Sequence, residues 1–447
     1  MFQRQTIDLL IECRWLLPMT DGLPLLEHQG VAVNAGRILE VGSIERLRQA
    51  FDADEILTLD RHAVMPGLVN AHNHAGMTLM RGYADDLPLM TWLNEHIWPA
   101  ESAHMDAQTV ADGTRLAMAE MLRSGTTTFS DMYLAPEAVA PLVDGSGMRA
   151  QLCTPLIDFA TPWASNFTEG LEKSEALIER YRDHNRLRFA LGPHAPYTVG
   201  DESLARLIEA RERLGIPVQM HVHETRDEVE RSLAQHGMRP LSRLDRAGLL
   251  TPDFQAIHMT QLEDDEIELV RDRGLSVVHC PQSNLKLASG FCPVSRLLAT
   301  GINVALGTDG ACSNNDLDMF DEMRTAALLA KGFSGDAATL PAMTALAMAT
   351  RSGARAIGLA EVTGQLRQGL AADITAVDME SLSAVPVYHP ASALVYAISS
   401  RQVSHVWVDG RLLVAQGQLM QEDERQLYAI AEHHRERMQS TRKVQTS

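Results

Sequence analysis

The sequence contains little cysteine and little lysine. Its five cysteines are scattered, odd in number and without a C-x-x-C pair, which argues against a disulfide framework or a thiolate zinc site. No run of about 18 apolar residues occurs, and the N-terminal residues do not resemble a signal peptide. We therefore expect no membrane association and a location in the reducing cytoplasm. The lysines are Lys173, Lys286, Lys331 and Lys443.

Basic residues are also outnumbered by acidic ones. The formal net charge of −19 and a pI near 5.3 repel phosphate backbones, so nucleic acid is not expected as a partner. With 45% hydrophobic and 22% charged residues over a length of 447, the composition is that of a globular protein and excludes a disordered or fibrous one. The length accommodates one large barrel and a smaller domain.

Both ends of the chain carry signals of β structure. Residues 30–33 and 38–41 flank the turn sequence Asn34-Ala35-Gly36-Arg37, and residues 403–408 and 412–414 flank Asp409-Gly410. Asn, Asp and Gly tolerate the positive φ angles of tight hairpin turns. Since neither end has enough core alone, we expect both to join in one small β-sandwich.

The middle of the chain alternates short apolar runs with helix-like segments such as 107–124 and 204–214, a pattern typical of parallel βα units. We predict an α/β fold with a (β/α)8 TIM-like barrel over residues 65–362. Residues 1–64 and 363–447 would form the β-sandwich, followed by a C-terminal helix and, from about Arg435, a fraying polar tail. The eight predicted strands are 68–74, 126–131, 148–154, 188–194, 217–223, 254–258, 275–280 and 302–309.

Six of these strands carry a candidate histidine or aspartate at their C-terminal end or within two residues of it. His72 and His74 are two apart on one strand and face the same side, so both can bind one metal ion. His221 and Asp309 would complete a His₃Asp set that suits Zn²⁺, with Fe²⁺ or Mn²⁺ as alternatives, and an open position for water. No lysine falls at a strand end, so we expect one metal rather than a lysine-bridged pair.

Glu224 follows the ligand His221 by three residues and is the candidate general acid/base, because a metal-activated water needs a nearby group to receive its proton. His258, at the end of the sixth strand, is a candidate to assist that water or a developing oxyanion. His194 and His279 end two further strands.

At this point the chain resembles the amidohydrolase superfamily, and within it the S-adenosylhomocysteine/5′-methylthioadenosine deaminase branch. The resemblance implies the same four ligands, Glu224 as proton shuttle and His258 as an assisting group. It spans nearly the whole chain and rests on Met65-Pro66-Gly67-Leu68-Val69-Asn70-Ala71-His72-Asn73-His74, Met77-Thr78-Leu79-Met80-Arg81-Gly82, Gly192-Pro193-His194-Ala195-Pro196-Tyr197, His221 with Glu224, Ser283-Asn284-Leu285-Lys286-Leu287, Leu306-Gly307-Thr308-Asp309-Gly310, Ser313-Asn314-Asn315 and Gly369-Leu370-Ala371-Ala372-Asp373-Ile374.

The same resemblance implies a purine nucleoside as the small-molecule substrate. Glu101 would bind both ribose hydroxyls, Trp92 would form an apolar wall beside the sugar, and His194 would contact the purine or ribose. His279 and Ser313 complete the expected substrate-binding set. Residues 81–101 are expected to act as a lid, and the family implies a homo-oligomer, a dimer or tetramer.

One departure from the branch bears on the substrate. The branch has arginines after the third barrel strand for the homocysteine carboxylate, but residues 152–160 and 166–174 contain none. We therefore expect 5′-methylthioadenosine as the main substrate, deaminated to 5′-methylthioinosine, with adenosine and S-adenosylhomocysteine as further substrates. Asp309 would pass a proton to the leaving amine. The alternatives are a guanine deaminase, a triazine-type aminohydrolase or chlorohydrolase and, more remotely, a non-catalytic scaffold of the same fold.

Overall fold

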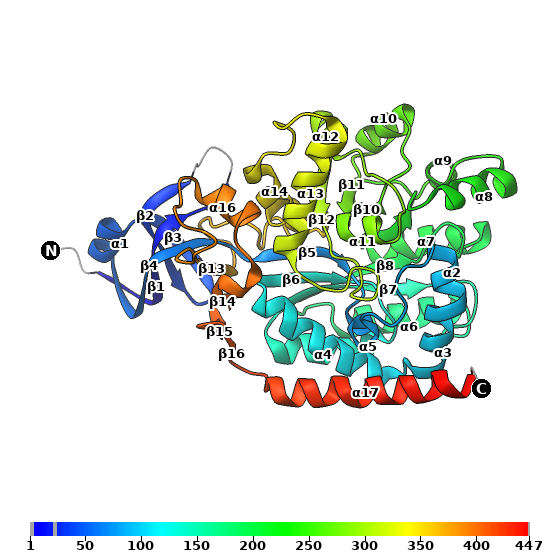
Figure 1. Ribbon diagram of the computed structural model, residues 1–447, viewed down its shortest axis with the longest axis horizontal. Coiled ribbons are helices and arrows are strands. Elements are labelled where there is room, and N and C mark those ends of the chain that lie inside the picture. Colours follow the sequence, from blue (N-terminus) through cyan, green and yellow to red (C-terminus); the bar gives the residue numbers. More distant parts are fainter. Residues whose placement is uncertain (1–3, 21–24, 446–447) are drawn as a thin grey trace.

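The computed structural model describes residues 4–20 and 25–445. A barrel forms the larger part of the molecule, and a smaller β domain at one end contains strands from both ends of the chain (Figure 1). No helix in these described ranges is long and apolar enough to cross a membrane.

The barrel confirms the predicted fold class. Its eight strands are parallel and follow one another in chain order around the sheet, and their ends differ from the predicted ones by at most three residues. Side-chain and backbone bonds between the first and last strands close it: Asn70 Nδ2 donates to Thr308 Oγ1 (2.7 Å), and Asp309 N donates to His72 O (3.0 Å). The strands are β5 (Leu68–Asn73), β6 (Thr126–Asp131), β7 (Arg149–Leu156), β8 (Leu187–Pro193), β9 (Val218–Val222), β10 (Phe254–His258), β11 (Ser276–His279) and β12 (Asn303–Leu306).

Helices cover the outside of the barrel (Figure 1). Helix α4 (Ala107–Arg123) begins at Asp106, whose carboxylate accepts a hydrogen bond from Thr109 N, and buries an apolar face that includes Val110 and Met118. The other helices around the barrel are α5 (Pro136–Ser146), α6 (Phe167–Arg180), α7 (Asp201–Leu214), α8 (Arg226–His236), α9 (Pro240–Ala247), α10 (Asp264–Arg273), α11 (Pro281–Lys286), α12 (Val294–Ala299), α13 (Met319–Ser334), α14 (Ala342–Met348), α15 (Arg351–Ala356) and α16 (Pro390–Tyr396), with the short η3 (Ser400–Gln402).

The β domain joins the two ends of the chain, as predicted, because β13 pairs antiparallel with β4. Both predicted hairpin turns are present, and both central residues of each have positive φ: 48° and 75° at Ala35 and Gly36, 47° and 72° at Asp409 and Gly410. The strands are β1 (Gln5–Leu16), β2 (Leu26–Asn34), β3 (Arg37–Ser43), β4 (Phe51–Pro66), β13 (Ile374–Asp378), β14 (Val403–Val408), β15 (Arg411–Ala415) and β16 (Gln418–Leu419), with helix α1 (Ile44–Ala50) between β3 and β4.

A buried ion pair fixes the barrel to the β domain. Arg149 at the start of β7 is 2% exposed, and its guanidinium contacts Asp373 (Nε to Oδ2, 3.0 Å) and Asp409 (Nη2 to Oδ1, 2.8 Å). A charge this deeply buried is tolerated because two carboxylates and a backbone carbonyl surround it. The barrel is thereby held in a fixed orientation on the smaller domain.

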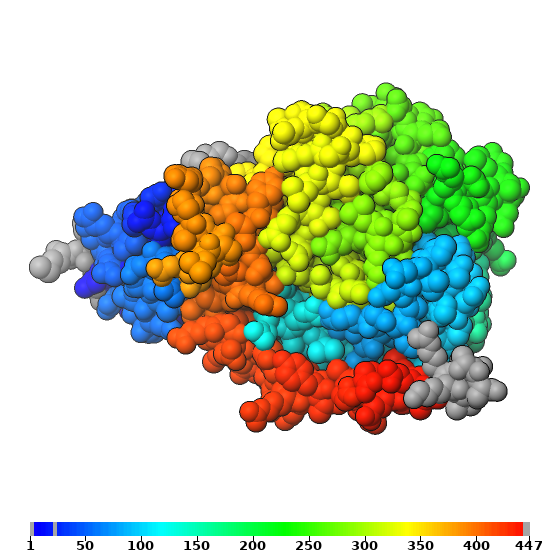
Figure 2. Space-filling model, in the orientation of Figure 1, coloured from blue at the N-terminus to red at the C-terminus, as the bar shows by residue number. Residues whose placement is uncertain are grey.

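The expectation of a fraying tail from Arg435 is wrong for the residues described. Helix α17 (Glu424–Gln445) continues to Gln445 and lies along the barrel under α3 and α4 (Figures 1 and 2). Arg437 Nη2 donates to His104 O and Thr109 Oγ1, both at 2.7 Å, and His434 Nε2 lies 2.9 Å from Asp112 Oδ2. These contacts hold a polar helix that its sequence alone would leave frayed.

The segment expected to act as a lid, residues 81–101, folds over the end of the barrel. It follows η1 (Ala75–Met80) and contains α2 (Leu89–Thr91), the π-helix η2 (Trp92–Ile97) and the first part of α3 (Trp98–His104). Lys286 Nζ contacts Asp85 Oδ1 at 2.6 Å and so ties this segment to α11. The segment thereby brings Trp92 and Glu101 to the open end of the barrel.

Candidate active site

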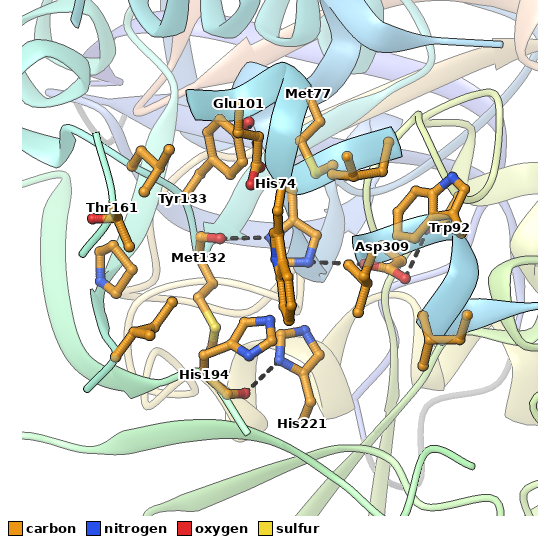
Figure 3. Close-up of a pocket in the computed structure, with 18 of the residues that line it drawn as sticks. His74, Met77, Trp92, Glu101, Met132, Tyr133, Thr161, His194, His221 and Asp309 are labelled. Carbon is orange, nitrogen blue, oxygen red and sulfur yellow. Dashed lines mark hydrogen bonds and ion pairs between the residues drawn. The ribbon is translucent and has the colours of Figure 1, made fainter. Parts of the chain in front are cut away.

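The carboxyl ends of three barrel strands bring four candidate ligands together. His72 lies in β5 and His74 directly follows it, His221 lies in β9, and Asp309 follows β12; one ligand atom from each lies within 4.8 Å of the others. His74 Nε2 is 3.0 Å from Asp309 Oδ1, and His72 Nε2 is 3.2 Å from His221 Nε2. Figure 3 shows His74, His221 and Asp309 pointing toward one another.

The three histidines are oriented in the same way, each by an acceptor at Nδ1. His72 Nδ1 lies 2.8 Å from Gln219 Oε1, His74 Nδ1 2.6 Å from Met132 O, and His221 Nδ1 2.6 Å from His194 O. Since all three acceptors are carbonyl oxygens, the proton of each neutral ring sits on Nδ1 and the lone pair of Nε2 faces the centre. Three imidazole nitrogens and one carboxylate oxygen form a donor set that fits one divalent metal ion.

Asp309 presents one oxygen to the centre and has the other occupied. Oδ2 accepts hydrogen bonds from Ser283 Oγ (2.6 Å) and Ser313 Oγ (2.9 Å), while Oδ1 faces the histidines. Although burial alone would raise the pKa of Asp309, the bonds with His72 and His74 hold it well below its usual value. The carboxylate is therefore charged and can bind a metal through a single oxygen.

Glu224 lies just past the end of β9, buried to 6% exposure in the same cavity. Its carboxylate is loosely held: Ser289 Oγ lies 3.4 Å from Oε1, and His258 Nε2 lies 3.8 Å from Oε2. Burial and the negative charge of Asp309 raise the pKa of Glu224 to about 8. A carboxyl group with a pKa near neutrality can both accept and return a proton.

His258 ends β10 and faces the centre through Nε2. Its Nδ1 lies 2.8 Å from the amide oxygen of Asn284, which places the proton of the neutral ring on Nδ1. Burial lowers the pKa of His258, so the neutral ring dominates near pH 7. Nε2 is then a hydrogen-bond acceptor suited to orienting a water molecule.

Glu101 and Trp92 reach the cavity from the segment above it, and His194 reaches it from the end of β8. Glu101 Oε1 accepts a hydrogen bond from Tyr133 OH at 2.8 Å (Figure 3). Burial raises the pKa of Glu101 to about 7. His194 packs against His221 with ring centroids 4.9 Å apart.

Two predicted residues lie differently from the rest. His279 does not line this cavity; it is enclosed next to Phe291 and Cys292, the residues before α12, and its Nδ1 has no hydrogen-bond partner in the described part of the chain. Ser313 does line the cavity, but its hydroxyl donates to Asp309 Oδ2.

The far end of the cavity, formed by the chain after β7, is apolar except for Thr161, whose hydroxyl donates to Ala164 O at 3.2 Å. Ile157, Phe159, Ala160 and Pro162 follow β7, and Trp98 packs edge-on against Phe159 with ring centroids 5.5 Å apart. No arginine or lysine lines the cavity within residues 4–20 and 25–440, whose side chains the structure describes.

Several residues that shape the site were missed from the sequence. Gln219 could have been found, since it is two residues before His221 on the same strand and faces the same side. Ser283 and Asn284 stand in a motif that carries the family resemblance, but neither their contacts nor that of Tyr133 could be inferred, because each acts on a partner at least 26 residues away along the chain.

Comparisons with known proteins identify the family of the chain. The sequence matches the amidohydrolase family over residues 63–413. It is similar to the 5-methylthioadenosine/S-adenosylhomocysteine deaminase of Saccharophagus degradans, at 48% identity over 431 residues that cover 96% of this chain and 97% of that protein.

Two solved structures resemble it as well. An adenosine deaminase from Xanthomonas campestris with bound zinc has a TM-score of 0.97 at 45% identity, covering 98% of this chain and all of that one. An atrazine chlorohydrolase from Arthrobacter aurescens, complexed with zinc, has a TM-score of 0.90 at 22% identity, covering 95% and 99% of the two chains. The second likeness concerns the fold alone.

Proposed function

The chain belongs to the amidohydrolase family, and from this premise we propose that it hydrolytically deaminates adenine nucleosides, foremost 5′-methylthioadenosine to 5′-methylthioinosine and ammonia. Adenosine and S-adenosylhomocysteine are further substrates. The observation that carries the proposal is the convergence of His72, His74, His221 and Asp309 beside the buried carboxyl of Glu224. The relative named 5-methylthioadenosine/S-adenosylhomocysteine deaminase, 48% identical over 96% of this chain, supports the substrate class.

We propose Zn²⁺ as the metal, since a solved relative at 45% identity contains zinc and the three-nitrogen, one-oxygen donor set suits it; the same set also accepts Fe²⁺ or Mn²⁺. When bound, such an ion lowers the pKa of a water molecule and supplies a nucleophile at neutral pH.

Side chains of the protein then transfer the protons. Glu224 receives a proton from the attacking water and delivers it to N1 of the purine, while His258 orients the water through Nε2. The water oxygen adds to C6. Asp309 takes the second proton of the water and passes it to the amine, which leaves as ammonia while the ring keeps the oxygen.

We propose that Glu101 binds the ribose hydroxyls. Tyr133 occupies its Oε1, no hydrogen bond among the described residues engages Oε2, and Glu101 lies in the cavity with Trp92 and His194. A carboxylate is an acceptor for two hydroxyl donors. This recognition requires the ionised form of Glu101.

Glu101→Ala should therefore raise KM for nucleosides strongly and change turnover of the free base adenine little. In the wild type, KM should rise about tenfold as the pH falls from 8 to 6, because a pKa of about 7 reduces the ionised fraction from about nine tenths to about one tenth. Glu101→Gln should remove this pH dependence, and Glu95→Ala, an exposed glutamate of the same segment, is the control. Equal damage to free base and nucleoside would exclude the ribose role.

The apolar far end of the cavity favours a small thioether over a charged amino-acid tail. Burying the homocysteine carboxylate beside Ile157 and Phe159 without a cation costs several kcal/mol, or the group must stay in water. We expect kcat/KM for 5′-methylthioadenosine to exceed that for S-adenosylhomocysteine by at least about tenfold. Ammonia release from these two, adenosine and guanine, measured in parallel, is the experiment that tests the function. Turnover of guanine alone would reject the proposed function. A higher kcat/KM for S-adenosylhomocysteine than for 5′-methylthioadenosine would reject the proposed substrate preference.

We also propose that the enzyme works in the cytoplasm as a homodimer or homotetramer. All five cysteines are free and buried, which suits a reducing compartment. Light scattering of the purified protein should give a mass two or four times the 49.2 kDa of the chain, whereas a monomer would reject this assembly.

A further inference from the structure

Glu228 is a buried carboxylate that has no basic partner. It lies in the first turn of α8 and is 5% exposed, and within the described residues no lysine, arginine or histidine forms an ion pair with it. Instead, Oε1 accepts a hydrogen bond from His223 N (2.9 Å) and Oε2 accepts one from Glu224 N (2.8 Å). Burial without a basic partner raises the pKa of Glu228 to about 8, and backbone N–H groups are the donors that hold its side chain in place.

Capping of the helix accounts for only part of the contacts of Glu228, whose side chain also contacts the backbone N–H of the N-cap residue Thr225. Thr225 already caps α8, since its hydroxyl accepts a hydrogen bond from Glu228 N. In a capping box the carboxylate would serve only the N-cap residue, Thr225. The side chain of Glu228 reaches further, to the amides of His223 and Glu224, the two residues just past β9.

The turn that Glu228 contacts is one the backbone does not adopt readily. His223 has a φ of +54°, in the left-handed region that a residue with a side chain rarely occupies. Such a conformation persists only when neighbouring groups hold it. The two bonds from Glu228 fall on the amide of His223 itself and on the next amide.

Thr260, just past β10, holds the same peptide from the other side. Its hydroxyl has one proton, and the nearest acceptor is the carbonyl oxygen of Glu224 at 2.7 Å, while its amide donates to His223 O at 3.0 Å. The N–H and the C=O of Glu224 are thus both bound by side chains from outside its strand. By contrast, the carboxylate of Glu224 has only the two long contacts described above.

We propose that Glu228 and Thr260 are positioning residues that set the place of the Glu224 carboxylate through its backbone. Because the backbone is held instead of the side chain, the carboxylate of Glu224 stays free to exchange protons while its distance from the reacting ring is fixed. Neither residue lines the cavity, so both act through Glu224 and not on the substrate. We call the contacts of Glu228 and Thr260 with the backbone of His223 and Glu224 the clamp. The expected kinetic effect rests on the proposed function, whereas the clamp itself does not.

The clamp is tested with Glu228→Gln, which keeps one acceptor oxygen and places an NH₂ group against an amide N–H. Glu230→Gln, an exposed glutamate on the same helix, is the matched control. Hydrogen–deuterium exchange at the His223 and Glu224 amides should increase in Glu228→Gln only. With the best nucleoside substrate, kcat should fall about ten- to a hundredfold while KM and metal content stay within about twofold.

A second readout separates positioning from general damage. A nucleoside with a tetrahedral, hydroxylated C6 and a protonated N1 should lose as much affinity as kcat/KM falls, because its N1–H requires Glu224 in place, whereas product affinity should stay unchanged. Thr260→Val should reproduce these losses and Thr260→Ser should restore them, which also decides the matter if Glu228→Gln does not fold.

The outcomes are distinct. Unchanged amide exchange in Glu228→Gln, or increased exchange with kcat and analogue affinity equal to those of Glu230→Gln, overturns the positioning role. A wild-type enzyme that releases no ammonia from any nucleoside refutes the proposed function, and amide exchange alone then decides the clamp.

Discussion

Glu224→Gln should lower kcat for ammonia release by about 10²- to 10⁴-fold, the range usual for loss of a general acid/base, with the metal still bound. Glutamine has nearly the shape of glutamate but cannot accept a proton from water or carry one to N1. Because the ligands do not change, metal content should equal that of the wild type. KM should change little, since the amide still fills the same space.

The measurement is steady-state ammonia release combined with metal analysis of the same preparation. Glu230→Gln is the control for an exposed glutamate of the adjoining helix. Turnover close to the wild-type value would remove Glu224 from the mechanism. Loss of metal together with activity would instead show that Glu224 supports the ligand set.

The same variant separates the proposed enzyme from a non-catalytic barrel of this fold. A scaffold is free to lose ligands and shuttle, whereas here the four ligand atoms converge and Glu224 lies in the same cavity. A scaffold would release no ammonia either as the wild type or as Glu224→Gln. Under the proposed function, selection of nucleosides over guanine or triazines would depend on Glu101 and on the apolar residues after β7 rather than on Glu224.

Much of the fold was predictable because each barrel strand is a short apolar run bounded by helix-like segments. The convergence of the four candidate ligands was predictable for a related reason: the ends of parallel strands meet at one face of a barrel, so residues as distant as His72 and Asp309 are brought together by topology alone. The hairpin turns were evident from residues that tolerate positive φ.

What escaped prediction depends on contacts between distant segments. A strand-end position does not determine which neighbours enclose a side chain, and His279 is surrounded by the residues before α12 rather than by the cavity. The bond between Tyr133 and Glu101 and the clamp on Glu224 arise from loops whose paths follow no periodic pattern. The helical conformation after Arg435 likewise depends on α3 and α4 as its support.

Removal of the metal should have an effect as large as that of Glu224→Gln. Treatment with a chelator, or His221→Ala, should lower turnover by at least about a thousandfold, because without the ion a neutral water is a poor nucleophile for an aromatic ring carbon. One equivalent of Zn²⁺ per chain should restore the chelated wild type but not the variant. In His221→Ala, Gln219 and Met132 still orient His72 and His74, but the set of metal ligands is incomplete.

His279→Ala is the matched control, since it removes a buried histidine from the adjoining strand outside the cavity and should leave metal content and KM unchanged. A metal-free protein that keeps its turnover would refute the metal-dependent mechanism. If Fe²⁺ or Mn²⁺ restores more activity than Zn²⁺, the identity of the ion changes but the ligand assignment does not, because the three Nε2 atoms and Asp309 Oδ1 form the same donor set for each ion. A stoichiometry near two per chain would contradict the single site, for which the described residues provide one group of four ligands.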